Sequence, residues 1–167
     1  MWYQFISSIL KTKTMNVLAP IKSIMTKNLV TVNPKDKLLD VKEAFDNHNI
    51  HHLPVVRFTE IVGIISKTDF LHFLRGFNHN EEDRFVNEAR LRAYTAEDIM
   101  TTGMAKLDPN DRINVALEVF LVNRFHAIPI VENNELVGIL TTFDIIKALA
   151  GEEVSAKQII ETRKTGH

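Results

Sequence analysis

The sequence lacks cysteine altogether among its 167 residues. This excludes disulfide bridges, thiolate-ligated metals and cysteine nucleophiles, and it fits the cytoplasmic location that we expect. The charges nearly cancel, giving a formal net charge of −1, and no basic stripe with interleaved aromatic side chains occurs. Domains that bind nucleic acid are usually basic, so we expect no nucleic-acid partner.

Long apolar runs are also lacking. The first ten residues, "MWYQFISSIL", are largely apolar, but a membrane-spanning helix needs about 20 such residues. A secretory signal would carry its positive charge before the apolar stretch, whereas Lys11 and Lys13 follow it. Three interpretations of this region stay open: a short amphipathic helix that packs on the domain or a partner, a tail upstream of a true start at Met15, and a peripheral membrane contact.

Sequence signatures of catalysis are missing as well. The chain has no P-loop, no Gly-x-Gly-x-x-Gly loop, no nucleophile elbow and no zinc-protease helix. We therefore expect a protein that is not an enzyme.

Two copies of one pattern make up most of the chain. The phrase "VGIISKTDF" at 62–70 returns as "VGILTTFDI" at 137–145, and "IMT" at 24–26 returns at 99–101. The same offset of 75 positions relates Pro34 to Pro109, Asp36 to Asp111, Glu43 to Glu118, Phe45 to Phe120, His51 to His126, Pro54 to Pro129 and Glu60 to Glu135. Because no gap is needed, we interpret the chain as an internal duplication.

Each copy predicts the order β-α-β-β-α. A short β-prone run ("LVTV", 29–32; "MAKL", 104–107) is followed by a proline turn, an amphipathic helix, two apolar strands and a second helix. Asp36 and Asp111 precede the first helices and are candidate caps. We predict an α/β (α+β) fold in which two repeats, related by a pseudo-twofold axis, pack sheet to sheet and share a core.

The duplication also sets the expected boundaries. These are an N-terminal extension at 1–17, repeat 1 at 18–75, a linker helix at 76–97, repeat 2 at 98–150 and a C-terminal tail at 151–167. Phe85, Ala89 and either Arg92 or Tyr94 lie at helical spacing in the linker, which we expect to be mostly exposed to solvent. The two ends are too short to hold a catalytic domain.

The ordered set of motifs resembles a tandem pair of CBS domains, the regulatory unit also called a Bateman module. The resemblance covers residues 18–150 and consists of "IMT", a proline turn, "HxxP" before valine or isoleucine, and "VGI" ahead of Ser or Thr three residues before Asp. Family membership implies a cleft between two sheets that binds AMP, ADP, ATP or S-adenosylmethionine as a regulatory ligand, with no catalytic cofactor. It also implies a homodimer that reports nucleotide status to a target enzyme or transporter.

The resemblance implies two ligand sites, each built from both repeats. Apolar side chains and strand backbone of one repeat would hold the adenine, and the Ser/Thr-x-x-Asp corner of the other would hold ribose and phosphate. One site would combine Met25, Val30, Ile50 and His51 with Thr141 and Asp144, and the other would combine Met100, Ala105, Phe125 and His126 with Ser66, Thr68 and Asp69.

The corner residues also permit a purely structural interpretation. A hydroxyl and free amides at a helix N-terminus suit a phosphate, and a carboxylate can accept hydrogen bonds from ribose hydroxyls. The same Ser-x-x-Asp or Thr-x-x-Asp spacing is equally an ordinary helix start with the hydroxyl as N-cap. Gly63 and Gly138, inside strands, indicate a close approach of either a ligand or the other repeat.

The chain departs from the family pattern at the expected phosphate position. Many nucleotide-binding members carry an arginine after the histidine of the His-x-x-Pro segment, where this chain has His52 and Ala127. Histidine is mostly neutral at pH 7, so the sequence suits an adenosine ligand with few or no phosphates, unless Lys67, Arg57 or Arg124 substitutes for the arginine.

A second departure distinguishes the two sites. Phe143 stands where the first copy has Thr68, and its ring would either crowd that site or stack on a base. We therefore favour the site that contains Asp69.

The histidine cluster "HNIHH" raises the question of a metal. His48 and His52 have i, i+4 spacing, but the preceding helix should end near Asn49, and no cysteine or nearby acid completes a site. We expect no metal.

The leading hypothesis is a stand-alone regulatory module that senses an adenosine ligand and signals through dimer or partner geometry. The alternative is a structural or interaction module without ligand binding, which Ala127 and Phe143 motivate. A nucleic-acid binder and a nucleotide-processing enzyme fit the sequence less well.

Overall fold

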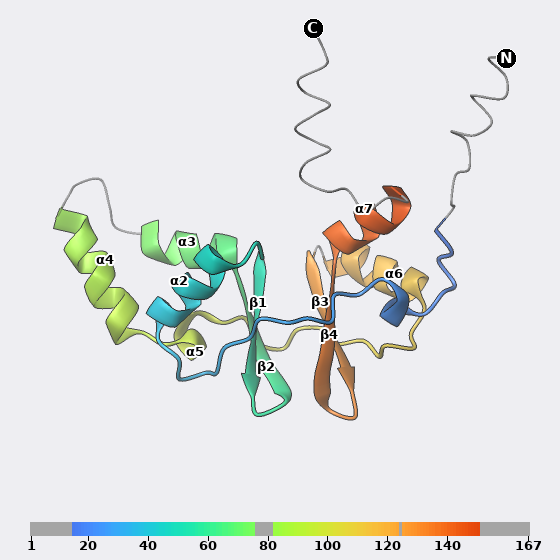
Figure 1. Cartoon of the computed structure of the whole chain (residues 1–167), viewed down its shortest axis with the longest axis horizontal. Helices are drawn as coiled ribbons and strands as arrows, with labels where there is room; N and C mark the ends of the chain where they lie inside the picture. Colours follow the sequence, from blue (N-terminus) through green and yellow to red (C-terminus); the bar gives the residue numbers. More distant parts are fainter. Residues whose placement is uncertain (1–14, 76–81, 124, 151–167) are drawn as a thin grey trace, which may run out of the picture.

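The computed structural model describes residues 15–75, 82–123 and 125–150. Two halves lie side by side, each with a hairpin toward the centre and helices toward the outer end (Figure 1). The predictions for residues 1–14 and for the tail at 151–167 lie outside the described residues. No helix within the described ranges is long and apolar enough to cross a membrane.

Each half contains the hairpin of one repeat and the helices on either side of it in sequence. The first half holds α2 (Leu38–Asn47), β1 (His52–Arg57), β2 (Glu60–Ser66) and α3 (Lys67–Arg75). The second half holds α6 (Ile113–Asn123), β3 (Ala127–Glu132), β4 (Glu135–Thr141) and α7 (Thr142–Ala150). The remaining elements are the 3-10 turn η1 (Ile21–Ser23) and the helices α4 (Glu82–Ala93) and α5 (Ala96–Ile99).

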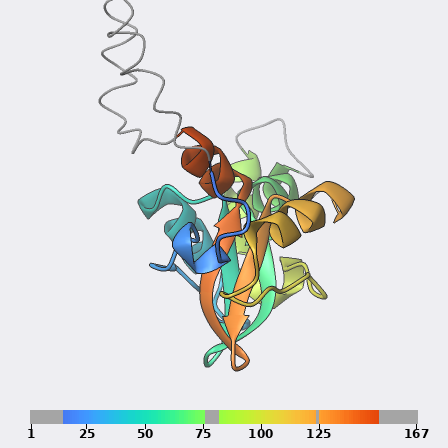
Figure 2. The ribbon, with the colours of Figure 1, turned by 90° about the vertical axis from the view of Figure 1, so that its right-hand side faces the viewer.

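The two hairpins have the same register. Both are antiparallel, and Val55 faces Gly63 in the first as Ile130 faces Gly138 in the second. Strands β2 and β4 contact each other, and seen along the long axis of the molecule the hairpins overlie one another with helices at their upper end (Figure 2). The predicted fold of two mixed helix-and-strand repeats is confirmed.

The strands predicted at 29–32 and 104–107 are wrong in extent. Each is reduced to a single bridge, in which Val32 pairs in parallel with Val55 and Leu107 with Ile130. The turn that begins at Asn33, immediately after Val32, ends the pairing on that side of the bridge.

Each half is completed by a segment that lies outside its own repeat in the sequence. Ile21 is fully buried in the core of the second half, and Ala96 is fully buried in the core of the first. The chain then crosses between the halves in opposite directions, along residues 24–32 and 99–107 (Figure 1). Neither half is therefore made from one continuous piece of chain.

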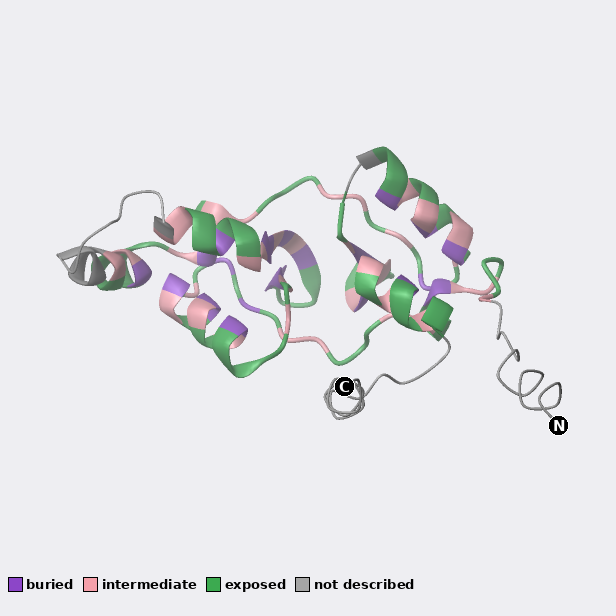
Figure 3. Ribbon diagram, turned by 90° about the horizontal axis from the view of Figure 1, so that it is seen from above, coloured by how far each residue is buried: buried purple, intermediate pink, exposed green. Residues whose placement is uncertain are grey.

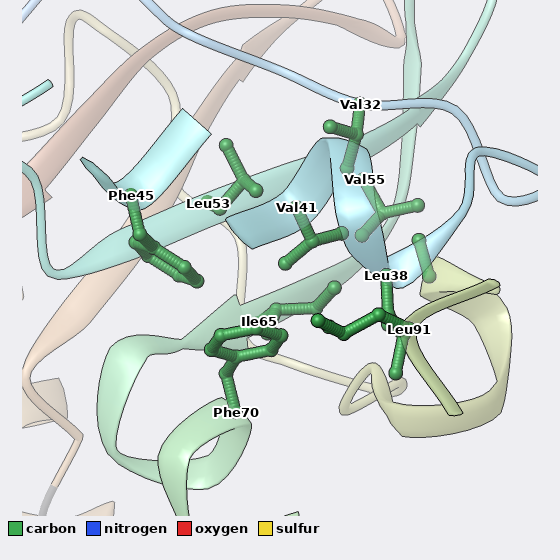
Figure 4. Packing of buried hydrophobic residues seen from close by; sticks show 10 residues of the cluster. Val32, Leu38, Val41, Phe45, Leu53, Val55, Ile65, Phe70 and Leu91 are labelled. Carbon is green, nitrogen blue, oxygen red and sulfur yellow. The ribbon is translucent and has the colours of Figure 1, made fainter. Parts of the chain in front are cut away.

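The core of the first half lies between the hairpin and its helices. Leu38, Val41 and Phe45 of α2 point toward the strands (Figure 4) and are almost completely buried. The ring of Phe45 meets that of Phe70 on α3 with 5.7 Å between the ring centroids. The helical spacing read from the sequence thus produces the buried face of α2.

The linker helix α4 also contributes to this core. Leu91 is only 6% exposed and belongs to the first-half cluster, because α4 lies against α2. Beyond the end of α4, the ring of Tyr94 meets that of Phe73 edge to face, with 5.2 Å between the ring centroids. Leu91 is thus an exception to the exposure expected for this helix.

The caps predicted from Asp36 and Asp111 are wrong. Oδ2 of Asp36 accepts a hydrogen bond from Asn33 N at 2.6 Å, and Oδ2 of Asp111 accepts one from Asp108 N at 2.8 Å. Both aspartates close the proline turn instead of the helix. The start of α2 is capped by Asp40, whose Oδ2 accepts from the backbone N of the residue before the helix at 2.8 Å.

The hairpin tip at Phe58 is the source of a stability prediction. Phe58 has a φ of 57° and is 94% exposed, whereas the equivalent position in the other repeat is Asn133 with a φ of 51°. The left-handed conformation costs a non-glycine residue roughly 1–2 kcal/mol, and asparagine tolerates it better. We expect Phe58→Asn to raise the free energy of unfolding by about 1 kcal/mol in urea titrations. Asn133→Phe is the matched control and should lower it, so equal stabilities of both variants and the wild type would contradict the prediction.

Candidate functional site

The first candidate corner lies where β2 ends and α3 begins, and consists of Ser66, Thr68 and Asp69. Asp69 N donates to Ser66 Oγ at 3.0 Å, and Ser66 Oγ donates to Asp69 Oδ2 at 2.6 Å. Ser66 thus caps α3, as the structural interpretation predicted. Asp69 is exposed, and within the described ranges its second oxygen, Oδ1, has no protein donor. We call this group the Asp69 corner.

The Asp144 corner, made of Thr141 and Asp144, is bonded more tightly. Thr141 N and Oγ1 donate to Asp144 Oδ2 at 2.7 and 2.6 Å, and Asp144 N donates to Thr141 Oγ1 at 3.2 Å. The hydroxyl of Thr26, from the other repeat, donates to Asp144 Oδ1 at 3.1 Å. Both carboxylate oxygens are therefore occupied, and the corner is half-buried.

The two glycines receive methionines of the opposite repeat. A Cβ atom added to Gly63 would lie 2.4 Å from the Met100 sulfur, and one added to Gly138 would lie 2.7 Å from the Met25 sulfur. Of the two interpretations of these glycines, the structure shows the close approach of the other repeat. The contacts bring Met100 to the strand that ends in the Asp69 corner, and Met25 to the strand that ends in the Asp144 corner.

The residue after each methionine forms backbone hydrogen bonds with the same strand that the methionine contacts. Thr26 N donates to Ile139 O at 2.9 Å, and Thr101 N donates to Ile64 O at 2.9 Å. The sequence interpretation missed both threonines as site residues, although their position in the repeated "IMT" was a usable signal. Thr26 lies directly on the Asp144 carboxylate.

His52 lies at the edge of the Asp69 corner. It begins β1 and faces Ser66 across the hairpin. Partial burial lowers the pKa of His52 below its usual 6.5, and the positive charges of protonated His126 and His51 lower it further, while Asp69 acts in the opposite direction. Neutral His52 is therefore favoured in the folded protein. His126, which comes from the second repeat, is close enough to act on it electrostatically.

The lowered pKa of His52 predicts a pH dependence of stability. The unfolded chain takes up a proton near pH 6.5, whereas folded His52 resists protonation, so this contribution is complete above about pH 6.5 and is lost as the pH falls toward the folded pKa. We expect the unfolding free energy, measured by urea titration, to fall less between about pH 7 and pH 5 in His52→Gln than in the wild type. The difference should correspond to the uptake of at most about one proton on unfolding. The exposed His48 provides the control His48→Gln, which should keep the decline. A decline unchanged in His52→Gln would contradict the assignment.

The other predicted site residues divide between core and surface. Val30 and Ile50 pack on the first-half core. Ala105 is half-buried, and Phe125 is 37% exposed. His51, Thr68 and His126 are exposed.

Neither of the two candidate cations that the structure describes, Lys67 and Arg57, donates a hydrogen bond to a corner residue. Lys67 Nζ donates to Phe45 O at 3.4 Å and is thus directed toward its own half. Arg57 is exposed and ends β1 opposite Glu60, away from Ser66, while Arg124 lies outside the described residues. Within the described ranges, no three histidine or acidic side chains are placed to hold a metal ion.

Comparison with known proteins identifies the repeated unit. The family model described as "CBS domain" matches this chain twice, at residues 21–76 and 96–151. The protein MJ1225 of Methanocaldococcus jannaschii is 28% identical over 134 residues, which cover 78% of this chain and 47% of that protein. The inosine-5'-monophosphate dehydrogenase of Thermoplasma acidophilum is 26% identical over 126 residues, 75% of this chain and 22% of the enzyme. The chain thus spans half or less of these relatives.

Solved structures share the fold over most of the chain. CBSX2 in complex with AMP has a TM-score of 0.65 at 23% identity and covers 80% of this chain and 97% of that one. The CBS domain pair of MJ0100 with 5'-methylthioadenosine and S-adenosyl-L-methionine has a TM-score of 0.65 at 22% identity, with coverages of 80% and 98%. The CBS domain of a bacterial CNNM/CorC family Mg2+ transporter with ATP has a TM-score of 0.66 at 22% identity, with coverages of 90% and 98%.

Proposed function

The chain belongs to the CBS domain family as a tandem pair of CBS domains, and from this premise we propose that it is a regulatory module that binds an adenosine ligand between its repeats. The observation that carries the proposal is the duplicated corner, in which a hydroxyl and a carboxylate at a helix start lie next to a segment of the opposite repeat. Solved neighbours of the same fold hold AMP, ATP, or 5'-methylthioadenosine with S-adenosylmethionine. Those ligands define the class that we propose for this chain.

The Asp69 corner is the better candidate for an occupied site. Its carboxylate keeps one oxygen without a protein donor, whereas both oxygens of Asp144 accept hydrogen bonds. A free carboxylate oxygen can accept from a ribose hydroxyl without breaking an existing bond. We propose that Ser66, Thr68 and Asp69 bind the ribose side of the ligand, with Met100, Ala105, Phe125 and His126 on the adenine side.

The charge around this corner favours a ligand with few phosphates. His52 stands where many nucleotide-binding family members have arginine, and burial holds its pKa low, so it is mostly neutral near pH 7. Lys67 is directed to Phe45 O. We therefore propose AMP or S-adenosylmethionine ahead of ADP and ATP.

We propose that this binding serves regulation and that the described residues do not catalyse a reaction. A ligand that contacts both repeats binds one relative arrangement of the halves better than another, and this difference in affinity can shift the population. We propose that the units 18–75 and 98–150 form the ligand-responsive pair, that the protein acts as a cytoplasmic homodimer, and that its readout is a target enzyme or transporter.

Calorimetric titration of the full chain with AMP, ADP, ATP and S-adenosylmethionine tests the proposal. We expect saturable binding of at least one of them, with AMP or S-adenosylmethionine tighter than ATP, and a rise in melting temperature that follows the affinity. Mass spectrometry of small molecules released from the denatured protein provides an independent identification. Absence of heat, of a melting shift and of any co-purified adenosine compound would refute ligand sensing.

A structural or interaction module without ligand remains the second candidate. Bonding of both Asp144 oxygens within the protein favours it, as do Ala127 and Phe143 at positions where phosphate and base contacts were expected. In that case Asp69→Ala and Asp144→Ala would change neither the response to adenosine compounds nor partner binding.

A further inference from the structure

The two corners differ in the bond that each makes with the opposite crossing segment. Thr26 and Thr101 occupy equivalent positions, and the backbone of each pairs in both directions with the strand that leads to a corner, Thr26 with β4 and Thr101 with β2, at 2.9 to 3.0 Å. The hydroxyl of Thr26 also donates to Asp144 Oδ1 at 3.1 Å. Within the described ranges no such bond joins the Thr101 hydroxyl to Asp69. The backbone is thus arranged alike at both corners, and the side-chain bond is not.

The Thr26 hydroxyl lies on the side of Asp144 from which a bridging ligand approaches. Thr26 belongs to the first repeat and Asp144 to the second, and a ligand held between the repeats reaches the carboxylate from that same side. The other carboxylate oxygen, Oδ2, already accepts from the amide and the hydroxyl of Thr141. A ribose hydroxyl at this corner therefore competes with Thr26 for Oδ1.

Other features of the Asp144 corner do not account for the difference. Phe143 stands beside Asp144 in the first turn of α7, but it is 68% exposed, so most of its ring surface faces solvent. A methionine of the opposite crossing segment lies against the strand at both corners, so this contact is common to the two. The Thr26 hydroxyl is the difference that the structure shows at the carboxylate oxygen itself.

The bond between Thr26 and Asp144 lies where it can open. Thr26 is exposed, and every residue of the crossing segment 24–32 except Val32 is exposed or half-buried. Seen from above, the two crossing segments run between the halves on opposite sides of the centre (Figure 3). At such a surface, water can replace a hydroxyl donor at a small net cost. The bond is therefore a reversible contact between the repeats and not part of either core.

We propose that Thr26 closes the Asp144 corner to the adenosine ligand and makes this corner a latent second site. The inference rests on the proposed function, because it assumes the same ligand class and the same binding of ribose by a carboxylate. Thr26 acts through Asp144 and is thus a positioning residue. In the wild type the Asp69 corner fills first, and the Asp144 corner binds at least about 10-fold more weakly, the value of one hydrogen bond to a charged group.

The latent site gives the module a second response. Ligand that enters the Asp144 corner at high concentration displaces Thr26 and breaks a hydrogen bond between the repeats, whereas ligand at the Asp69 corner leaves that bond in place. Low and high ligand concentrations therefore produce different contacts between the repeats.

Calorimetry of the full chain with AMP, and separately with S-adenosylmethionine, tests the inference by counting sites. At concentrations that saturate the Asp69 corner, we expect one site per chain in the wild type and two in Thr26→Ala. Thr26→Ser keeps the hydroxyl and should return the count to one. In Thr26→Ala combined with Asp69→Ala, one tight site should remain, at the Asp144 corner. A merely structural role of Thr26 would lose binding and would not add a site.

Thr59 provides a matched control for general loosening between the repeats. Its hydroxyl donates to Glu135 Oε1 at 3.3 Å, which is also a bond from threonine to a carboxylate of the other repeat, but at the hairpin tips. Thr59→Ala should leave the count at one. A second site in Thr59→Ala would show that weaker contact between the repeats, and not the release of Asp144, opens the corner, and this would overturn the inference.

Urea titration without ligand tests the bond apart from binding. Thr26→Ala and Asp144→Ala should each lower the unfolding midpoint, and the double variant should lose less than the sum of the two single losses. Strictly additive losses, one site in both the wild type and Thr26→Ala, or two equal sites in the wild type would overturn the inference and leave the proposed function intact. Binding of neither compound by any of the variants would refute the proposed function, and the latent site with it.

Discussion

Replacing Gly63 by alanine is expected to lower the free energy of unfolding by about 2 kcal/mol, the usual cost of overpacking a filled site. The added Cβ would lie 2.4 Å from the sulfur, 2.7 Å from Cγ and 2.9 Å from Cβ of Met100. Contacts below 3.0 Å that reach back to the Cβ of Met100 cannot be relieved by rotating the end of its side chain. The backbone at Thr101, which is hydrogen-bonded to Ile64 in β2, must move as well.

Gly138 provides the matched control in the second half. A Cβ there would lie 2.7 Å from the sulfur, 3.1 Å from Cε and 3.2 Å from Cγ of Met25, so the flexible end of this methionine can give way. We expect Gly138→Ala to cost clearly less than Gly63→Ala in urea titrations. Combining Gly63→Ala with Met100→Ala should recover part of the loss, with a coupling energy of about 1 kcal/mol. Equal costs at the two glycines, or strict additivity with Met100→Ala, would contradict the packing that we describe.

The sequence predicted the repeat because the duplication is a property of the sequence itself. The offset between "VGI" phrases located both hairpins, and the helical spacing of Val41 and Phe45 located the buried face of α2. The exchange of segments between halves was not predictable in the same way. Burial of Ile21 in the second half and of Ala96 in the first depends on contacts between residues far apart in the chain, and identical repeats would satisfy the same pattern by packing on themselves.

The sequence predicted which residues form the candidate site, but not which of their polar atoms remain without a hydrogen bond. The spacing of Ser66 and Asp69 predicted both a helix cap and a ligand corner, and only the coordinates show that one carboxylate oxygen stays unbonded after the cap has formed. Nothing in the spacing distinguished it from Asp144, whose second oxygen accepts from Thr26. That bond joins residues 118 positions apart, so the sequence around Asp144 does not predict it.

Replacement of Asp69 by alanine is expected to weaken binding of the adenosine ligand by about 10- to 100-fold, the cost of about one or two hydrogen bonds to a charged group. The helix cap itself survives, since Ser66 Oγ still accepts from the backbone N of residue 69. Stability in the absence of ligand should therefore change little. Calorimetry with AMP and S-adenosylmethionine measures the first effect, and urea titration without ligand measures the second.

Asp144→Ala should show the opposite pattern. Its carboxylate accepts from Thr141 N, from the Thr141 hydroxyl and from the Thr26 hydroxyl. Removing it leaves the backbone N–H of Thr141 without this acceptor and breaks the hydrogen bond to Thr26 of the other repeat. The Thr141 hydroxyl still caps α7 through the backbone N of residue 144, but the loss of the bonds to Thr141 N and to Thr26 should cost about 1 kcal/mol. Ligand affinity should fall less than in Asp69→Ala. The two aspartates, alike in sequence context, are thus expected to separate into a binding residue and a structural residue. Equal losses of affinity in both variants would show that the unbonded oxygen of Asp69 does not decide which corner holds the ligand.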